Sequence, residues 1–336
     1  VCGIWEDGFH ITKMEFEMRC ILSIIIVAFI TGCNPGEIPI SPHASGELET
    51  TMIEIGSEYN NQIFYNLESN SVVSQNEKTD WDLGFLTGVD EWHIVINSSK
   101  AGGIWSVENL DFEDTPEIED AVWEFDSPNG NLDSTAIDDY RNSDKFFVVD
   151  LGYSSTEEQL GYMKLKIDSV NESGYFIRTA DLTHEQESLV FIEKDADLHR
   201  VCFSFSENFA VDIEPLSSDW DLLFTQYTNL FYDPFSAYLV TGVLINSQYI
   251  TVAIDSEKEF NEITYEDIES YSFSSNQDVI GYDWKDFDFD SGFYLIYAEK
   301  NYIIKNGLDQ YFKIHFIDFY DDLGEKGHPT FEILQL

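Results

Sequence analysis

Cysteine is scarce in this sequence, with only four in 336 residues. Cys2 and Cys20 lie in an N-terminal segment that we expect to be removed, and Cys33 has a separate role described below. The remaining chain keeps one cysteine, Cys202, inside a short apolar stretch, where it is expected to be a small buried hydrophobic residue. The count therefore excludes a disulfide framework and a cysteine-based metal site.

Basic side chains are also few. Lysine and arginine number 17 against 64 aspartates and glutamates, which gives a formal net charge of -47. Residues 1–32 hold four acidic and two basic residues, so 60 acidic and 15 basic side chains remain after them. Such a surface repels nucleic acid and anionic lipid headgroups. We expect no nucleic-acid partner and a strongly solvated domain, and charge-steered binding of a cationic ligand is the alternative.

Catalytic motifs are absent from the sequence. It contains no Gly-x-Ser-x-Gly elbow, no His-Glu-x-x-His, no phosphate loop and no dinucleotide fingerprint. Residues 286–292 alternate Asp and Phe, but their glycine comes one place later than a calcium loop requires, so a half-buried strand is favoured. The sequence predicts a protein that is not an enzyme, and we assign no metal site.

No run near the N-terminus is long enough to span a membrane. Residues 20–31 are uncharged, but twelve residues are fewer than the roughly 20 that a spanning helix needs. They have the length of the hydrophobic region of a signal peptide, and Lys13 and Arg19 precede them. The run ends in Ile-Thr-Gly-Cys at 30–33, which resembles the lipobox of bacterial lipoproteins, in which the cysteine thiol receives a diacylglyceryl group.

We therefore expect a signal peptide over residues 1–32, cleavage before Cys33 and lipidation of Cys33. Met14 and Met18 are both candidates for the true start. Two or three acyl chains would hold the protein on a membrane. Residues 33–55 contain three prolines and two glycines without a long apolar run, which is typical of a tether.

Beyond the tether the sequence repeats itself. Thr79–Phe85, which reads TDWDLGF, recurs as Ser218–Phe224, which reads SDWDLLF. Three further anchors keep the same order at offsets of 138 to 149 residues: 65–67 with 203–205, 95–98 with 244–247, and 162–167 with 311–316. We interpret the chain as two homologous units, residues 56–192 and 193–336.

The second unit is expected to carry a longer loop. The offset between the units increases from 139 to 149 after Phe224, which places the extra residues between Thr225 and Leu239. This segment is rich in aromatic residues, and surface loops often carry binding residues, so it is a candidate binding element.

Short runs of Ile, Val, Tyr and Phe, separated by polar breaks, predict β-strands throughout both units. Residues 311–316 alternate apolar and polar side chains, as expected for a strand with one face on a core. A short helix is expected near residues 264–269. The predicted fold is all-β, with mainly antiparallel sheets that are sandwich-like or stacked, one per unit or shared between the units.

Several of these motifs together resemble one protein family. The Trp-Asp-Leu-x-Phe motifs at 81–85 and 220–224, the segment 280–285 and the C-terminal stretch 311–331 are similar to the HmuY family of Bacteroidetes lipoproteins. The resemblance is strongest over roughly 195–336 and implies an all-β protein of the outer membrane, on its periplasmic or cell-surface face. It also implies binding of haem or a porphyrin-like ligand and transfer of that ligand to a TonB-dependent receptor.

The resemblance includes one departure. Haem-carrying members often have His-Arg-Tyr after the Trp-Asp motif, whereas this chain has Thr225-Gln226-Tyr227. Haem iron takes axial ligands from His, Met, Cys or Tyr. The candidate ligand-binding residues are His93, which follows Trp92 in an expected loop, and three others: His184, His199 and Tyr227.

Each of these histidines has an alternative interpretation as a surface or turn residue. His315 is expected to face solvent from its strand, and Trp81 and Trp220 are expected to anchor the core.

An alternative function follows from the missing histidine: a non-catalytic surface interaction or adhesion lipoprotein that binds no small molecule.

Overall fold

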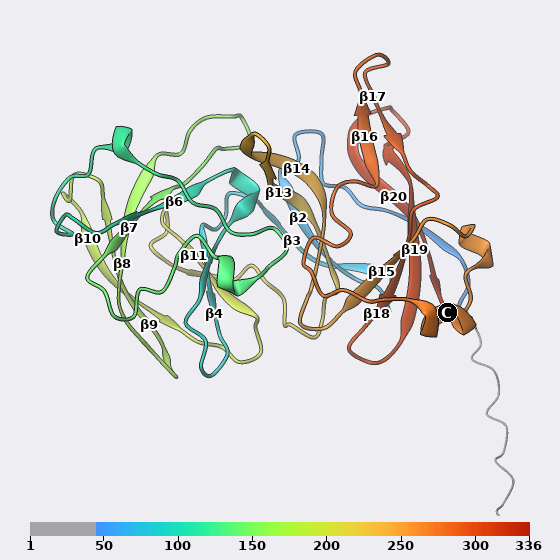
Figure 1. The fold of residues 1–336 in the computed structure, drawn as a ribbon, viewed down its shortest axis with the longest axis horizontal. Coiled ribbons are helices and arrows are strands. Elements are labelled where there is room, and N and C mark those ends of the chain that lie inside the picture. Colours follow the sequence, from blue (N-terminus) through green and yellow to red (C-terminus); the bar gives the residue numbers. More distant parts are fainter. Residues whose placement is uncertain (1–44) are drawn as a thin grey trace, which may run out of the picture. The chain divides into compact units, whose positions relative to one another are not determined.

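The computed structural model describes residues 45–336, whose regular elements are β-strands and short 3-10 helices (Figure 1). The predicted all-β class with antiparallel sheets is confirmed. Cys33, the signal peptide and most of the tether lie outside the described residues. None of the helices in residues 45–336 has the length and apolar character to cross a membrane.

Two antiparallel sheets form what we call the first lobe. One sheet has the order β10-β9-β8-β7-β6, with strands at β6 Gly103–Val107, β7 Phe146–Asp150, β8 Tyr162–Asn171, β9 Gly174–Asp181 and β10 Glu187–Glu193. The other has the order β12-β11-β4-β5, with strands at β4 Leu83–Leu86, β5 Ile94–Ile96, β11 Arg200–Ser204 and β12 Phe209–Val211. Phe85 of β4 meets Tyr175 of β9 at a ring-centroid distance of 5.1 Å, so the apolar faces of the two sheets share one core.

Two more antiparallel sheets form the second lobe. One has the order β1-β20-β19-β18-β15, with strands at β1 Glu49–Met52, β15 Thr251–Asp255, β18 Asn301–Lys305, β19 Tyr311–Tyr320 and β20 Lys326–Gln335. The other has the order β14-β13-β2-β3, with strands at β2 Asn61–Asn66, β3 Ser71–Glu77, β13 Leu222–Tyr232 and β14 Phe235–Ile245. Tyr65 of β2 lies against Phe331 of β20, and the two sheets enclose a second core.

The remaining elements are short. A two-stranded sheet joins β16 Lys285–Asp288 to β17 Phe293–Ile296. The 3-10 helices are η1 Ser98–Lys100, η2 Ile118–Asp120, η3 Leu132–Ser134, η4 Phe260–Glu262 and η5 Tyr265–Ser270. Helix η5 confirms the short helix predicted near 264–269, and the Thr264 and Asp267 side chains form a capping box at its start.

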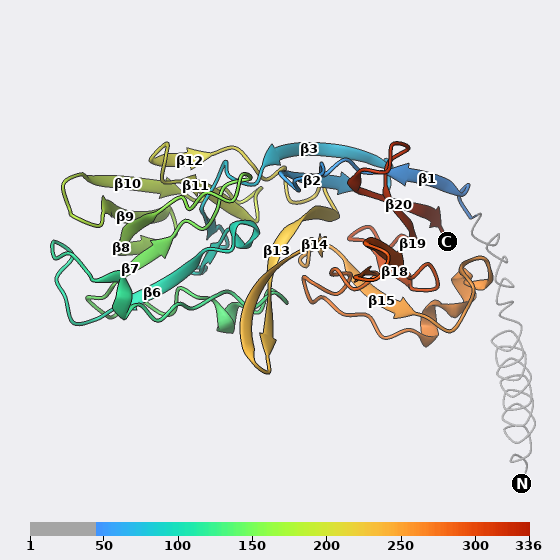
Figure 2. The same ribbon diagram turned by 90° about the horizontal axis from the view of Figure 1, so that it is seen from above.

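Each lobe takes strands from both halves of the sequence. In the second lobe β2 pairs with β13, with Tyr65 opposite Leu222. In the first lobe β11 pairs with β4, with Phe203 opposite Leu83. Figure 2 shows β1, in blue, beside β20, in red. The expected units 56–192 and 193–336 therefore do not form separate sheets, and the duplication itself stays a prediction.

The aspartates of both Trp-Asp motifs make the same backbone contacts at these strands, β11 beside β4 and β2 beside β13, which we call the exchanged strands. Trp81 and Trp220 are buried, as predicted for core residues. The Asp82 amide donates to Phe203 O, and the Asp82 carboxylate accepts from the amide of Phe205 at 2.7 Å. A carboxylate that accepts a backbone N–H at the end of an incoming strand fixes where that strand stops.

The second copy repeats this pattern across the other lobe. The Asp221 amide donates to Tyr65 O, and its carboxylate accepts from the amide of Leu67 at 2.8 Å. One difference separates the copies, because Lys100 donates to the Asp82 carboxylate in a buried ion pair. Asp221 is equally buried without a lysine, and burial raises its pKa to about 6.

Two expectations need correction. The segment from Thr225 to Leu239 is not a loop: most of it belongs to β13 and β14, because their pairing continues without a break from Leu222 to the turn at Asp233 and Pro234. His315 does not simply face solvent. Its ring stacks on Phe260 at 4.1 Å, and its nitrogens contact Ala298 O and the Glu332 carboxylate.

The two aspartates should respond differently to loss of charge. We expect Asp82→Asn to lower the free energy of unfolding by about 3–5 kcal/mol, because it leaves the Lys100 ammonium buried without its counter-ion. Asp221→Asn should cost less than about 1 kcal/mol, because an amide oxygen can still accept from Leu67. Urea unfolding of both variants measures the difference, and equal losses would contradict the role given to Lys100.

Candidate functional site

A cavity of about 190 Å³ lies where the sheet of β4, β5 and β11 meets the sheet of β2, β13 and β14. The first lobe contributes residues near β5 and β11 and the segment from Asp126 to Thr135. The second lobe contributes Gln62 and Phe64 from β2, and Leu223, Thr225, Gln226 and Tyr227 from β13. The exchanged strands thus supply opposite walls of one cavity.

Two of the four predicted ligand residues, His199 and Tyr227, line this cavity. His199 is partly buried just before β11. Burial, with a smaller effect from the neighbouring Arg200 charge, lowers the pKa of His199 to about 3. The imidazole is therefore neutral at physiological pH, which is the form that binds metal ions.

Tyr227 and Cys202 are the other residues of ligating type at the cavity. Tyr227 is packed among Phe64, Trp220 and Leu244, and burial raises the pKa of its hydroxyl. Burial also raises the pKa of the Cys202 thiol. Both side chains stay protonated near neutral pH, and since the thiolate is the metal-binding form of cysteine, His199 is the best donor at the cavity.

Buried charges form part of the cavity wall. The Arg200 guanidinium pairs with the Glu214 carboxylate at 2.7 Å, and the other oxygen of Glu214 is buried without a hydrogen-bond partner in the described structure. Asp126 accepts the backbone amides of Ile96 and Ala136, each at 2.7 Å. Burial raises the pKa of Asp126 to about 6 in spite of these bonds.

Hydrogen-bonded polar groups surround one end of the cavity. Trp81 Nε1 donates to Gln62 Oε1 at 2.7 Å, and Gln62 Nε2 donates to Thr225 Oγ1 at 3.1 Å. Trp81 therefore combines a core position with a polar contact to Gln62, and Gln62 in turn reaches Thr225 in the other half of the chain. Thr225 is one of the residues in the positions where the resemblance led us to look for a histidine.

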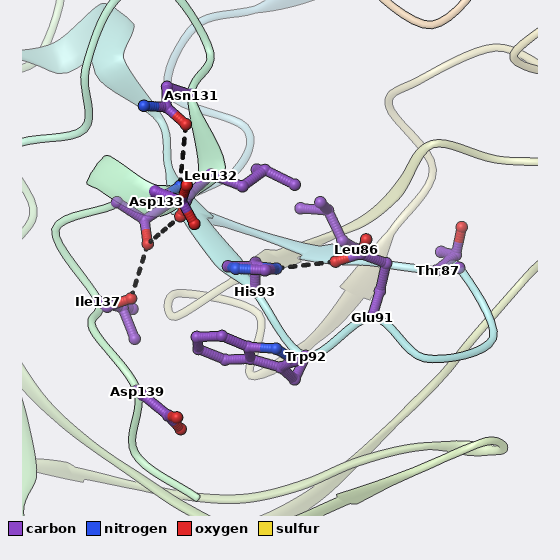
Figure 3. A network of polar contacts seen from close by, with 12 residues as sticks. Leu86, Thr87, Glu91, Trp92, His93, Asn131, Leu132, Asp133, Ile137 and Asp139 are labelled. Atoms are coloured by element: carbon purple, nitrogen blue, oxygen red, sulfur yellow. Dashed lines mark hydrogen bonds and ion pairs between the residues drawn. The ribbon is translucent and has the colours of Figure 1, made fainter.

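His93 is not among the residues that line the cavity, although Figure 3 shows it near Leu86 and Leu132, which do. Its ring stacks on Trp92 at 3.9 Å, and its Nδ1 is 2.8 Å from the Glu91 carboxylate. Arg141 covers the Trp92 ring at 4.0 Å and pairs with Asp139. One ring nitrogen of His93 is thus engaged in a surface cluster.

His184 is also held elsewhere, in the turn between β9 and β10. Its Nε2 is 3.1 Å from the Glu187 carboxylate, and its Nδ1 is 3.3 Å from the Lys164 ammonium. Both ring nitrogens already have partners. The structure therefore brings together His199 and Tyr227 but neither of the other predicted histidines, and within residues 45–336 no three metal-ligating side chains cluster.

The donors at the cavity fit one axial ligand of a haem iron, not two. Haem iron accepts a single histidine in several protein classes, and the neutral His199 ring satisfies that requirement. The volume fits less well, because sites for larger ligands hold roughly 300–1,000 Å³. A porphyrin would therefore fit only in a cavity larger than the one observed.

Sequence reasoning missed the charged residues of the wall, Asp126, Arg200 and Glu214. No motif distinguishes them, and with 64 acidic residues in the chain any carboxylate pair is uninformative. Arg200 and Glu214 meet because β11 and β12 form a hairpin, which brings the first residue of β11 close to the residues that follow β12. Arginine is scarce, with only four in the sequence, and this was the one sequence feature that could have drawn attention to Arg200.

Comparison with known protein families gives one match. The model of the HmuY protein family matches residues 58–333. No curated protein matches the chain.

Solved structures give several likenesses of low identity. A Tannerella forsythia apo HmuY analogue is 10% identical with a TM-score of 0.33, covering 87% of this chain and 97% of its own. Apo PinO from Porphyromonas gingivitis is 9% identical with a TM-score of 0.35, covering 86% and 98%. A protein described as HmuY-like and haem-binding, from Bacteroides vulgatus, is 11% identical with a TM-score of 0.22, covering 85% and 90%. At these identities and TM-scores, the similarity to solved structures does not indicate which ligand this chain binds.

The raised pKa values of Asp126 and Asp221 predict how stability depends on pH. Between about pH 4 and 6 the folded chain holds protons on these carboxyls that the unfolded chain releases, so acidification favours the folded state. The neutral ring of His199 opposes this trend, because acidification protonates His199 in the unfolded chain but not in the folded chain. The test is therefore a comparison: as the pH falls from about 7 to 5, the urea midpoint of Asp221→Asn should change less favourably than that of the wild type, because one of the two raised carboxyls is lost. Identical changes in the two proteins would contradict the raised pKa of Asp221.

Proposed function

Because the chain belongs to the HmuY family, we propose that it is a lipid-anchored, non-enzymatic protein of the outer membrane that binds haem or a porphyrin-like ligand. In this role it passes the ligand to a TonB-dependent receptor. The single observation that carries the proposal is the family match, and the neutral His199 imidazole at a cavity between the two lobes supports it.

The membrane anchor rests on the lipobox-like sequence that ends at Cys33. A diacylated cysteine binds a bilayer firmly, whereas the acidic domain behind it is repelled by anionic headgroups. The tether at 33–55 would keep that domain in water, on the periplasmic or the cell-surface face.

We expect Cys33→Ser to move the protein from the membrane fraction to the soluble exported fraction, because the acyl chains are its attachment to the bilayer. Fractionation of cells that express each form, with mass spectrometry of the N-terminal peptide, measures this. Cys202→Ser is the matched control and should remain with the membrane. An unmodified thiol at Cys33 in the wild-type protein would remove the anchor from the proposal.

His199 is the residue that would hold the haem iron. Apolar side chains from both lobes, among them Leu86, Leu132 and Leu223, line the same cavity and would provide apolar surface for the ring. A bound haem would supply the iron and the visible absorption, and the chain would supply the imidazole.

Hemin titration of the exported chain should produce a shifted Soret band and saturable binding. We expect His199→Ala to weaken binding at least about tenfold and to change the band, because the imidazole that would bind the iron is lost. His93→Ala and His184→Ala are matched controls that should bind as the wild type does. If the wild type shows no saturable shift, or if His199→Ala leaves the spectrum unchanged, the haem assignment to this cavity is wrong.

A second candidate function, a surface interaction lipoprotein without a small ligand, has its own supporting observation. Large aromatic side chains are exposed near the turn of the β13–β14 hairpin, where Tyr232 is 75% exposed, and in the β16–β17 hairpin, where Phe289 is 89% exposed. Exposed apolar residues gathered on projecting hairpins favour contact with another protein. A stable partner recovered from solubilised membranes without porphyrin absorbance would favour this function.

A further inference from the structure

A second concavity, separate from the cavity at His199, encloses about 480 Å³. Three lysines line it: Lys78 between β3 and β4, Lys100 in η1, and Lys326 at the start of β20. Ser154 and Gln226 add neutral polar groups to the same lining. We call this concavity the lysine pocket. Its volume lies within the roughly 300–1,000 Å³ typical of small-molecule sites.

Lys78 is the most constrained of the three. Its side chain is only 6% exposed, and its ammonium donates to Gln226 Oε1 at 2.6 Å. Burial lowers the pKa of Lys78, and no carboxylate counteracts this effect. An ammonium has three N–H donors, and this one carries a buried charge for which the described residues supply no counter-ion.

The other two lysines differ in how their charge is balanced. Lys100 is paired with the buried Asp82 carboxylate, so its charge is compensated within the fold. Lys326 is exposed and lies 4.7 Å from the centre of the Tyr59 ring. Neither Lys326 nor Lys78 forms an ion pair with any residue in 45–336. Two uncompensated cations therefore face the same concavity.

Lys78 also differs from two other buried lysines that lack a carboxylate partner. Lys164 and Lys313 each donate to two backbone carbonyls, whereas Lys78 donates to Gln226 alone among the described residues. Glu58 and Glu157 also line the pocket, but both are exposed, and water screens their charge. Lys78, in contrast, is desolvated, and only a group inside the pocket can reach it.

We propose that the lysine pocket binds a small soluble anion that carries phosphate or carboxylate groups, with Lys78 and Lys326 as its charge partners. Lysine binds such groups as a point charge, and a charge-assisted hydrogen bond would use the N–H donors that Lys78 has left. The net negative charge of the chain repels anions at a distance, so affinity must come from contact inside the pocket.

This inference does not depend on haem binding. His199, Arg200 and Glu214 line the first cavity and not the lysine pocket. Gln226 lines both, so it is left unchanged in the test. A chain that binds no hemin could still bind an anion here, and the two outcomes are separable.

Calorimetric titration of the exported chain with inorganic pyrophosphate and with citrate tests the proposal at constant ionic strength. We expect saturable binding of at least one of these anions, weakened about tenfold or more in Lys78→Met because a buried charge partner is lost. Lys326→Gln changes an exposed residue and cannot disturb the core, so it should weaken binding without altering the urea midpoint. Lys305→Gln removes the same charge outside the pocket and should bind as the wild type does.

Two results would overturn the proposal. One is the absence of saturable binding by either anion, and the other is an equal loss in Lys305→Gln and Lys326→Gln, which would indicate a general effect of net charge. Sedimentation with phosphatidylglycerol vesicles distinguishes the source of the phosphate. Co-sedimentation that depends on Lys78 and Lys326 would replace a soluble anion by a lipid headgroup.

Discussion

Two buried carboxylates, those of Asp82 and Asp221, hold the ends of strands that come from the other half of the chain. Each accepts a backbone amide 123 or 154 residues away in sequence, Phe205 for Asp82 and Leu67 for Asp221. The exchanged strands place Gln62 beside Trp81 and Thr225, which is where the first cavity forms. The candidate site therefore depends on this pairing of distant strands, and Asp82 and Asp221 fix where two of those strands end.

Many of the scarce basic residues lie inside the protein. Six lysines are buried, and two of them hold backbone carbonyls at equivalent places in the two lobes. Lys164 donates to Phe112 O and Asp114 O, and Lys313 donates to Phe260 O and Ile263 O. Because these charges are removed from the surface, the solvent meets an even more acidic face than the composition indicates. Among the buried lysines that form no ion pair within residues 45–336, Lys78 is the one that lines the lysine pocket, which is why the anion proposal centres on it.

The sequence predicted the class of the fold and the core role of Trp81 and Trp220, because alternation and aromatic runs are local signals. It placed the aromatic segment 225–239 in a loop, since an inserted stretch looks the same whether it lengthens a loop or a hairpin. It could not show that β2 pairs with β13, because pairing over such separations leaves no local pattern. For the same reason four candidate ligands were proposed and only His199 and Tyr227 line one cavity.

The pairing of β1 with β20 has a consequence for the connectivity of the fold. The Gly46 amide donates to Gln335 O, so both ends of the described chain lie at neighbouring strands of one sheet. Joining these ends and opening the chain between β3 and β4 would give a circular permutant in which each lobe is one continuous stretch, β4–β12 followed by β13–β20 and β1–β3. The sharing of strands between the two halves of the sequence thus follows from the position of the chain termini. The permutant would keep every strand pair and would no longer share strands in this way.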